Sequence, residues 1–398
     1  MVTGPGPGGL ASAGSGPRVA VVGVHGHGAS HVRNVARLAA AGRVRFAAVA
    51  DPRPPDHRPE GVAIFADLPS LLAATPVDVV VICTPIQTHV PLAELALRSG
   101  ADVLLEKPPT ASLAEFEQLS SVLAETGRSC QVGFQVAGSR AARTLASLVA
   151  DGRLGELRGI GAVGAWVRTA EYWQRARWAG RRSLDGIAVV DGAVTNPFAH
   201  ATAAALMVDG SARADQVVSV ETELFRANPI EADDTSAVRT VTSRGTTVVT
   251  ALTLCADRPD AEPMVIVHGS EGRAVLRYPS DRLEVTIDGM TTTTQYERDD
   301  LLENLLDHRA DPGVPLLAPL SATGGFTRVV EAVRVAPPPG EIPAELVRWE
   351  GEGPQRRPIV PGVEKWVTQA AEDLALFSEL GAPWALQNNR TTKRSTDR

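Results

Sequence analysis

The stretch Arg18–Gly28, RVAVVGVHGHG, decides the fold of the N-terminal part of the chain. Its first half is a short β-branched run, which is typical of a strand. Its second half is a glycine-rich turn, and Val32 and Val35 follow at helical spacing. A strand, such a turn and a helix in this order predict a site where the helix N-terminus binds a pyrophosphate through backbone N–H groups and its dipole.

The glycines of this turn have separate expected roles. Gly23 allows the tight turn, and Gly28 allows close packing of helix against strand. The second position of the usual G-x-G-x-x-G pattern holds His25, so its side chain must point away or Gly26 must supply clearance for the phosphates. A glycine-rich turn without a cofactor is the alternative. A metal site at His25 and His27 is not expected, because no carboxylate or Cys stands at ligand spacing.

The alternation of strands and helices continues to about residue 136. Repeated strand–helix units predict a parallel, right-handed, doubly wound sheet. The fold class is therefore α/β, with an N-terminal Rossmann domain. Further strand-like runs stand at 44–51, 77–85, 101–108 and 129–134.

After residue 137 consecutive strands replace the alternation. A helix at 139–151 and a strand at 157–167 precede several strand-like segments with short turns between 215 and 288. This pattern indicates a C-terminal α+β domain with an open, largely antiparallel sheet. A final helix is expected at about 363–380. The predicted domains are a disordered tail (1–17), the Rossmann domain (18–136), a substrate and oligomerisation domain (137–336), a C-terminal extension (337–387) and a frayed tail (388–398).

Composition limits the classes of function. The 398 residues are 44% hydrophobic and 21% charged, and the net charge is −7. These values fit a soluble globular protein and argue against a general binder of nucleic acid or acidic membranes. No apolar run is long enough to span a bilayer, and the N-terminus lacks the features of a secretory signal. Cys83, Cys130 and Cys255 match no metal or disulfide pattern, so a reducing cytoplasm is expected.

Two charged residues at the end of the second strand bear on the choice of cofactor. Asp51 can bind the adenosine ribose hydroxyls and repel a 2′-phosphate, which favours NAD over NADP. Arg53 weakens this preference, because its guanidinium can pair with such a phosphate.

The strand within 101–108 leads directly into Glu106-Lys107-Pro108. Because the carboxyl ends of the strands line the ligand crevice, we expect Lys107 to face the cofactor cleft. There it can hold a substrate hydroxyl and help to lower its pKa during hydride abstraction. An exposed lysine at the end of a strand is the alternative interpretation.

The segment 192–200, GAVTNPFAH, places a polar residue four positions before a histidine. Asn196 and Pro197 are typical of the N-cap and first position of a helix. His200 then lies in the first turns, where the helix dipole lowers its pKa and keeps the imidazole neutral, as a general base requires. The alternative is a helix start without catalytic role.

Five motifs follow one another in an order that resembles the glucose–fructose oxidoreductase and inositol dehydrogenase family, the Gfo/Idh/MocA group. The resemblance covers about residues 18–335 and implies a Rossmann domain with bound nicotinamide dinucleotide. It also implies an open second sheet that often forms the oligomer interface, and sugars, sugar derivatives or cyclitols as substrates. The motifs are the glycine turn, Cys83-Thr84-Pro85 with His89, Glu106-Lys107-Pro108, Val132–Gln135 and Asn196-x-x-x-His200.

The resemblance also implies roles for single residues. Lys107 matches the catalytic lysine and His200 the catalytic histidine, while Asn196 stands where the family usually has Asp. Asn carries no charge and cannot relay a proton, although Asp185 or Asp191 could supply the charge if the loop folds back. The expected cofactor-binding residues are Gly23, His25, Gly26, Gly28, Asp51, Arg53, Thr84, Pro85, His89, Glu106 and Lys107.

The segment 171–186 is rich in aromatic residues and Arg. Aromatic rings suit the apolar faces of sugars, and Arg suits hydroxyl or anionic groups. A packed aromatic cluster with solvated Arg side chains is the alternative. The expected substrate-binding residues are Tyr172, Trp178, Arg182 and Asn196.

These features predict an NAD-dependent oxidoreductase that oxidises or reduces a secondary alcohol or ketone of a sugar, glycoside or cyclitol. His200 would be the general acid or base, and Lys107 would polarise the substrate oxygen. The alternatives are an enzyme with tightly bound, recycled NAD that catalyses epimerisation, elimination or glycoside cleavage, and a non-catalytic sensor on the same fold. A homo-oligomer is expected, because an open sheet needs its exposed face covered.

Overall fold

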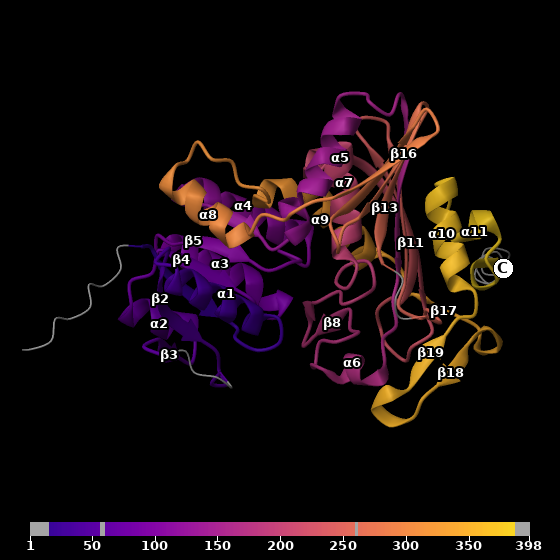
Figure 1. Ribbon diagram of the computed structural model, residues 1–398. Helices are drawn as coiled ribbons and strands as arrows, with labels where there is room; N and C mark the ends of the chain where they lie inside the picture. Colours follow the sequence, from indigo (N-terminus) through magenta and orange to yellow (C-terminus); the bar gives the residue numbers. More distant parts are fainter. Residues whose placement is uncertain (1–15, 56–59, 259–261, 387–398) are drawn as a thin grey trace, which may run out of the picture.

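The computed structural model describes residues 16–55, 60–258 and 262–386, which form two large sheets with helices around them (Figure 1). The predicted tails 1–17 and 388–398 lie outside the described residues, except for Gly16 and Pro17.

The first sheet confirms the predicted doubly wound fold. It has six strands in the order β3-β2-β1-β4-β5-β6, and every neighbouring pair is parallel. The strands are β1 (Arg18–Val22), β2 (Arg45–Ala50), β3 (Ala63–Phe65), β4 (Val79–Ile82), β5 (Asp102–Leu105) and β6 (Cys130–Val132). The main helices are α1 (Gly28–Ala40), α2 (Leu68–Ala74), α3 (His89–Arg98) and α4 (Leu113–Thr126).

Alternate residues of each central strand pack on opposite faces of this sheet. Val19 and Val21 of β1 belong to one buried cluster with α1, whereas Ala20 and Val22 belong to another with α3 and α4. Helix α8 (Leu301–Ala310), from the second domain in sequence, completes the first cluster (Figure 1). The N-terminal sheet therefore packs with a helix from far along the chain, so one boundary in the sequence does not separate the two domains.

The second sheet is largely antiparallel, as predicted. Its order is β16-β15-β14-β13-β7-β12-β11-β10-β17, and only the β7–β12 and β10–β17 pairs are parallel among the described residues. The long strand β7 thus lies in the interior of the sheet. The strands are β7 (Leu157–Ala165), β10 (Val217–Arg226), β11 (Thr235–Thr242), β12 (Thr247–Thr253), β13 (Met264–Gly269), β14 (Gly272–Arg277), β15 (Arg282–Ile287), β16 (Met290–Gln295) and β17 (Gly340–Glu341).

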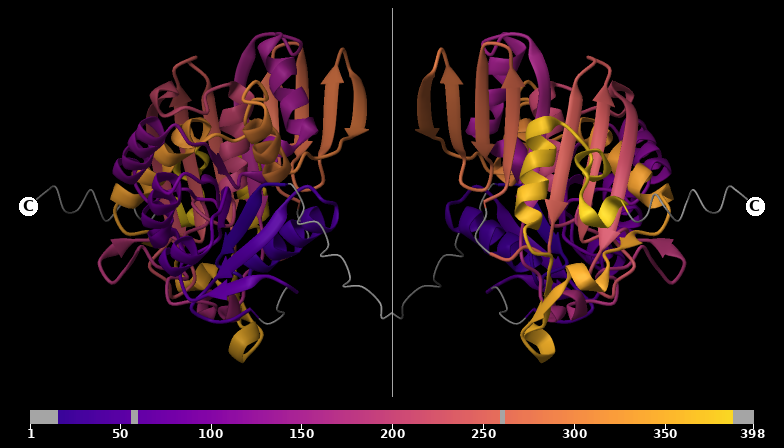
Figure 2. Two further views of the ribbon diagram at one scale, coloured as in Figure 1. Left: turned by 90° about the vertical axis from the view of Figure 1, so that its left-hand side faces the viewer. Right: turned by 90° about the vertical axis from the view of Figure 1, so that its right-hand side faces the viewer.

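Helices cover both faces of this second sheet. The face toward the first domain carries α5 (Arg140–Ala150), α7 (Ala199–Asp209) and α9 (Gly324–Val335) (Figure 1). On the opposite face, α10 (Val363–Asp373) packs across β7 and β12 (Figure 2). The chain's own C-terminal extension thus covers part of the face that was expected to form an oligomer interface.

The extension differs in detail from the prediction. The helix expected at 363–380 is two helices, because Leu374 adopts a left-handed conformation (φ 54°) and ends α10 before α11 (Phe377–Leu380). A short hairpin of β18 (Arg348–Glu350) and β19 (Arg357–Ile359) was not predicted, since three-residue strands leave little periodicity.

Two further expectations concern the whole chain. Cys83, Cys130 and Cys255 are all free, as predicted. Among the described residues, every helix is too short or too polar to cross a membrane.

Candidate active site

A cavity of about 1020 Å³ lies at the carboxyl ends of the first sheet's strands. The glycine turn and Glu106–Pro108 line one side, and residues between Trp166 and His200 line the other. The strand order reverses between β1 and β4, and ligands of doubly wound sheets bind at such a switch point.

The glycine turn has the geometry of a phosphate cradle. Gly23 has a φ of +83°, and an added Cβ there would collide with the carbonyl oxygen of Cys83. A Cβ at Gly28 would collide with the carbonyl oxygen of Gly23. Gly26 also has a positive φ (+56°), but nothing lies within 4 Å of its Cβ position. The close approach of the backbone therefore requires glycine at positions 23 and 28. Gly26 leaves open space beside the start of α1.

The end of β2 fits the ribose end of a dinucleotide. Asp51 Oδ2 accepts the Val24 N–H at 3.0 Å and Oδ1 accepts the Arg53 N–H at 2.9 Å, so the carboxylate is fixed at the cavity wall. The His25 ring turns toward this loop, with Nε2 3.1 Å from the Arg53 carbonyl oxygen. The side chain therefore points away from the clearance at Gly26, which fits bound NAD.

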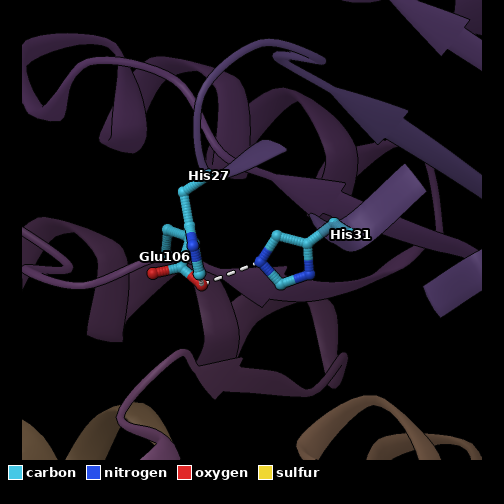
Figure 3. Close-up of side chains that lie close together, drawn as sticks. All are labelled: His27, His31 and Glu106. Carbon is cyan, nitrogen blue, oxygen red and sulfur yellow. Dashed lines mark hydrogen bonds and ion pairs between the residues drawn. The ribbon is translucent and has the colours of Figure 1, made fainter. Parts of the chain in front are cut away.

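Glu106 joins the glycine turn to the loop after β5. Its Oε1 accepts from His31 Nε2 at 2.8 Å and lies 3.3 Å from His27 Nε2 (Figure 3). The same oxygen accepts from Gln135 Nε2 at 3.2 Å. Burial alone would raise the pKa of Glu106, but the hydrogen bonds from His27 and His31 outweigh it and lower that pKa. The same contact raises the pKa of His27.

Among the described residues, His27, His31 and Glu106 form the one group of side chains that could hold a metal ion. The ligand atoms of His27, His31 and Glu106 all lie within 4.8 Å of one another (Figure 3). The expectation that no carboxylate stands near His27 was therefore wrong, because the fold brings Glu106 from a distant strand. The Gln135 amide and the Lys107 N–H, at 3.1 Å, also donate to Glu106, so hydrogen bonds already satisfy the carboxylate.

His89 ties the two loops that flank the cavity floor. Its ring lies 2.8 Å from the Thr84 carbonyl oxygen and 2.9 Å from the Pro108 carbonyl oxygen. Burial lowers the pKa of His89. Thr84, Pro85 and His89 all line the cavity, as expected of residues near the nicotinamide ribose.

Lys107 is held by a chain of hydrogen bonds that ends on a buried carboxylate. Its Nζ donates to Asn196 Oδ1 at 2.8 Å, and Asn196 Nδ2 donates to Asp191 Oδ1 at 2.6 Å. Asp191 also accepts the Gly180 N–H at 2.8 Å and pairs with Arg175 at 3.0 Å. Burial lowers the pKa of Lys107, while Glu106 and Asp191 oppose that effect.

The loop that carries Asn196 does fold back. Asp191 therefore supplies the charge, whereas Asp185 is exposed and pairs with Arg177 at 3.3 Å. The prediction that Asn196 caps the helix was wrong: α7 begins at Ala199, and Phe198 holds the N-cap position. The Asn196 side chain is instead taken by the two longer-range hydrogen bonds.

His200 lies in the first turn of α7 and lines the cavity. Its Nδ1 is buried without a hydrogen-bond partner among the described residues, and Phe134 packs edge-on against its ring at 5.6 Å. Burial, followed by the charge of Lys107, lowers the pKa of His200 to about 3. The predicted direction was right, but burial rather than the helix dipole is the main cause.

The end of the cavity opposite the glycine turn is lined by aromatic and cationic side chains. Tyr172 and Trp178 line it, as predicted, and the Arg175 guanidinium stacks 3.7 Å and 4.5 Å from their ring centroids. Helix α6 (Ala170–Gln174), which carries Tyr172, is braced by the extension, because the Ala170 N–H donates to the Arg356 carbonyl oxygen at 2.8 Å.

Arg182 does not reach this cavity. Its guanidinium donates to the carbonyl oxygens of Val333, Ala336 and Pro337, at 3.1, 2.6 and 2.8 Å, and so satisfies the end of α9. The prediction of a substrate contact was therefore wrong. The cavity residues that sequence reasoning missed are Trp166, Arg168 and Arg175. Trp166 and Arg168 could have been found from the Trp-x-Arg pattern at the end of the predicted strand 157–167, and Arg175 from the Arg-rich segment 171–186.

Comparison with known proteins bears on this geometry. A family model described as "Oxidoreductase family, NAD-binding Rossmann fold", GFO_IDH_MocA, matches residues 17–134. The N-terminal domain is therefore similar to the NAD-binding domain of the Gfo/Idh/MocA oxidoreductase family. The resemblance drawn from the motifs is thereby confirmed.

Curated relatives match the chain over short segments. It is 37% identical over 81 residues to the uncharacterized oxidoreductase YdgJ of Escherichia coli, which is 20% of this chain and 23% of that protein. It is 43% identical over 58 residues to scyllo-inositol 2-dehydrogenase (NAD(+)) of Bacillus subtilis, which is 15% of this chain and 17% of the enzyme. The matched segments thus span less than a quarter of these relatives' lengths.

Solved structures extend the likeness of fold to most of the chain. The WlbA dehydrogenase of Bordetella pertussis, solved with NADH and UDP-GlcNAcA, aligns with a TM-score of 0.65 at 19% identity. The alignment covers 80% of this chain and 95% of that one. At this identity the comparison shows likeness of the two-domain fold alone.

Proposed function

We propose that this chain is an NAD-dependent oxidoreductase acting on a secondary alcohol or ketone of a sugar, glycoside or cyclitol. The observation that carries the proposal is the shared cavity of Lys107 and His200. One is an ammonium held by Asn196, and the other is an imidazole that burial keeps neutral. The named relatives are dehydrogenases and oxidoreductases, which agrees with this chemistry.

NAD would be held by residues that already form a fitting cradle. Gly26 and the start of α1 would bind the pyrophosphate, and Asp51 the adenosine ribose. Thr84 and Pro85 would lie near the nicotinamide ribose, with His89 fixing their loop. When bound, NAD accepts or returns the hydride. The full proposed cofactor set remains Gly23, His25, Gly26, Gly28, Asp51, Arg53, Thr84, Pro85, His89, Glu106 and Lys107.

The chain's own residues would handle the proton. Lys107 Nζ would donate a hydrogen bond to the substrate oxygen and stabilise negative charge that develops there. Because Nδ1 of His200 is buried, its Nε2 is the nitrogen that can take the hydroxyl proton during oxidation. Asn196 would keep Lys107 in place, and Tyr172 and Trp178 would contact the sugar ring.

A cofactor-reduction assay tests this function. Protein, NAD and a panel of polyols, glycosides and cyclitols should give reduced cofactor, followed by its absorbance. Lys107→Ala should abolish the signal, while the matched control Lys365→Ala, at an exposed position of α10, should retain it. If the protein binds NAD tightly but no compound of the panel yields reduced cofactor, net oxidation of these substrates is contradicted. Product formed without added NAD would instead select the recycled-cofactor reaction.

A further inference from the structure

Arg168 is a fixed cation on the substrate wall of the cavity. Its backbone N–H donates to the Leu254 carbonyl oxygen at 3.2 Å, which extends the sheet beyond β7. Its guanidinium lies 4.8 Å from the ring centroids of both Trp166 and Tyr172. Stacking between two aromatic rings restricts the side chain, so the guanidinium is positioned before any ligand arrives.

The hydrogen-bonding capacity of Arg168 is largely unused. A guanidinium has five N–H donors, and that of Arg168 donates from Nη1 to the Val167 carbonyl oxygen at 2.9 Å and also to the Tyr172 hydroxyl, which leaves further donors for a ligand. No carboxylate in the part of the chain that the structure describes forms an ion pair with it. Its neighbour Arg175, by contrast, is paired with Asp191.

The carboxylates that line the cavity all have partners other than Arg168. Asp191 is the carboxylate of this wall, and it already accepts from Arg175, Gly180 and Asn196. Glu106 contacts His27 and His31, Asp51 accepts from the N–H groups of Val24 and Arg53, and Asp67 accepts from the Ser70 N–H. Arg168 is therefore a cation of the cavity lining that forms no ion pair with a carboxylate of the described residues.

We infer that the substrate carries an anionic group, a carboxylate or a phosphate, which Arg168 binds. Guanidinium groups recognise the two through parallel charge-assisted hydrogen bonds, and an aromatic wall beside the cation fits the sugar to which the anion is attached. This inference rests on the proposed function for the rest of the substrate, and it narrows the class to sugar acids and sugar phosphates.

A series of side-chain contacts connects Arg168 to Lys107, the residue proposed to bind the reacting oxygen. Arg168 and Arg175 stack on the same Tyr172 ring. From Arg175 the contacts run through Asp191 and Asn196 to Lys107. One ligand can therefore place its oxidised carbon at Lys107 and its anion further along the same wall.

Calorimetric titration tests the inference without turnover. The probes are D-glucuronate, D-glucose 6-phosphate and D-glucose, each added with and without NAD. We expect saturable millimolar or tighter binding of at least one anion, and weaker binding of glucose. Arg168→Gln should weaken anion binding about tenfold or more, since a hydrogen bond to a charged group is lost, and Arg168→Lys should restore part of it. The matched control is Arg356→Gln, since Arg356 also stacks on a tryptophan (4.4 Å from Trp349) but does not line the cavity.

The outcomes separate this inference from the proposed oxidoreductase. Anion binding that depends on Arg168 supports the inference even if NAD is never reduced. Preference for glucuronate or for glucose 6-phosphate identifies the anion as carboxylate or phosphate. Absence of saturable anion binding, anion binding unchanged by Arg168→Gln, or neutral sugars oxidised as efficiently as anionic ones would overturn it, and the last result would leave the oxidoreductase intact.

Discussion

The amide of Asn196 donates to Asp191 across 2.6 Å while its carbonyl oxygen accepts from Lys107 across 2.8 Å. A neutral residue thus connects a buried carboxylate to a half-buried ammonium. Because the amide cannot ionise, Asp191 acts on Lys107 through the electrostatic field and through the orientation of Asn196. Under the proposed function, Asp191 is expected to be a positioning residue whose effect is visible in pH dependence.

Replacing Asp191 with Asn should reduce activity and shift its alkaline limb. The carboxylate opposes the lowering of the Lys107 pKa, so its removal lowers that pKa further. Lys107 would lose its proton at lower pH, and kcat/KM should begin to fall at lower pH than in the wild type. Full pH profiles measure this shift. Asp185→Asn, at an exposed carboxylate, is the control, and equal profiles for both variants would refute the role.

Replacing Asn196 with Asp should move the pH profile upward. A second carboxylate would favour the charged form of Lys107 and raise its pKa. Residue 196 and Asp191 would then be neighbouring carboxylates, so one of them would hold a proton to a higher pH than usual. Both effects shift the profile of kcat/KM against pH toward higher pH. An unchanged profile would show that residue 196 serves only to hold the loop.

His200→Gln should lower kcat by about 10²–10⁴-fold, the usual effect of losing a general base, with NAD affinity unchanged. The wild-type group has a pKa of about 3, so it remains a neutral base through the mildly acidic range. Steady-state kinetics and direct NAD titration measure the two quantities. A drop in NAD affinity with constant kcat would assign His200 to the cofactor instead.

The same histidine should make stability depend on acid. Its pKa falls from an ordinary value of 6.5 to about 3 on folding, so the unfolded chain binds the proton first. Stability is therefore fully retained above 6.5 and lost progressively as pH falls toward 3. Thermal melts between these pH values should show a shallower acid slope for His200→Gln than for the wild type. Equal acid slopes for the two proteins would indicate that other titratable groups dominate the loss of stability in acid.

Val367→Asp should destabilise the whole chain. Val367 is fully buried where α10 packs on the second sheet. A charge there lacks a partner and costs several kcal/mol, on the order of 3–5. Chemical denaturation measures the loss, and Lys365→Asp on the exposed side of α10 is the control. Unchanged stability would mean that the extension is dispensable as a cover for this face.

Local sequence determined the elements and their order. The run Val19–Val22 is apolar on both faces, and the glycines that follow permit only a few turn geometries, so the doubly wound sheet was predictable. Short-range patterns also predicted the sites of Lys107 and His200, because a residue at the end of a strand or the start of a helix keeps that place in any packing of the elements.

Only the tertiary structure decided which charges meet. Glu106 reaches His27 and His31, Asp191 reaches Asn196, and Arg182 turns to the end of α9 instead of the cavity. Capping propensity alone favoured Asn196 at the start of α7, but two hydrogen bonds with partners outside the helix replaced the cap. Such choices depend on groups that are distant in sequence and on burial, which sets the strength of each charge interaction, and neither is encoded in local periodicity.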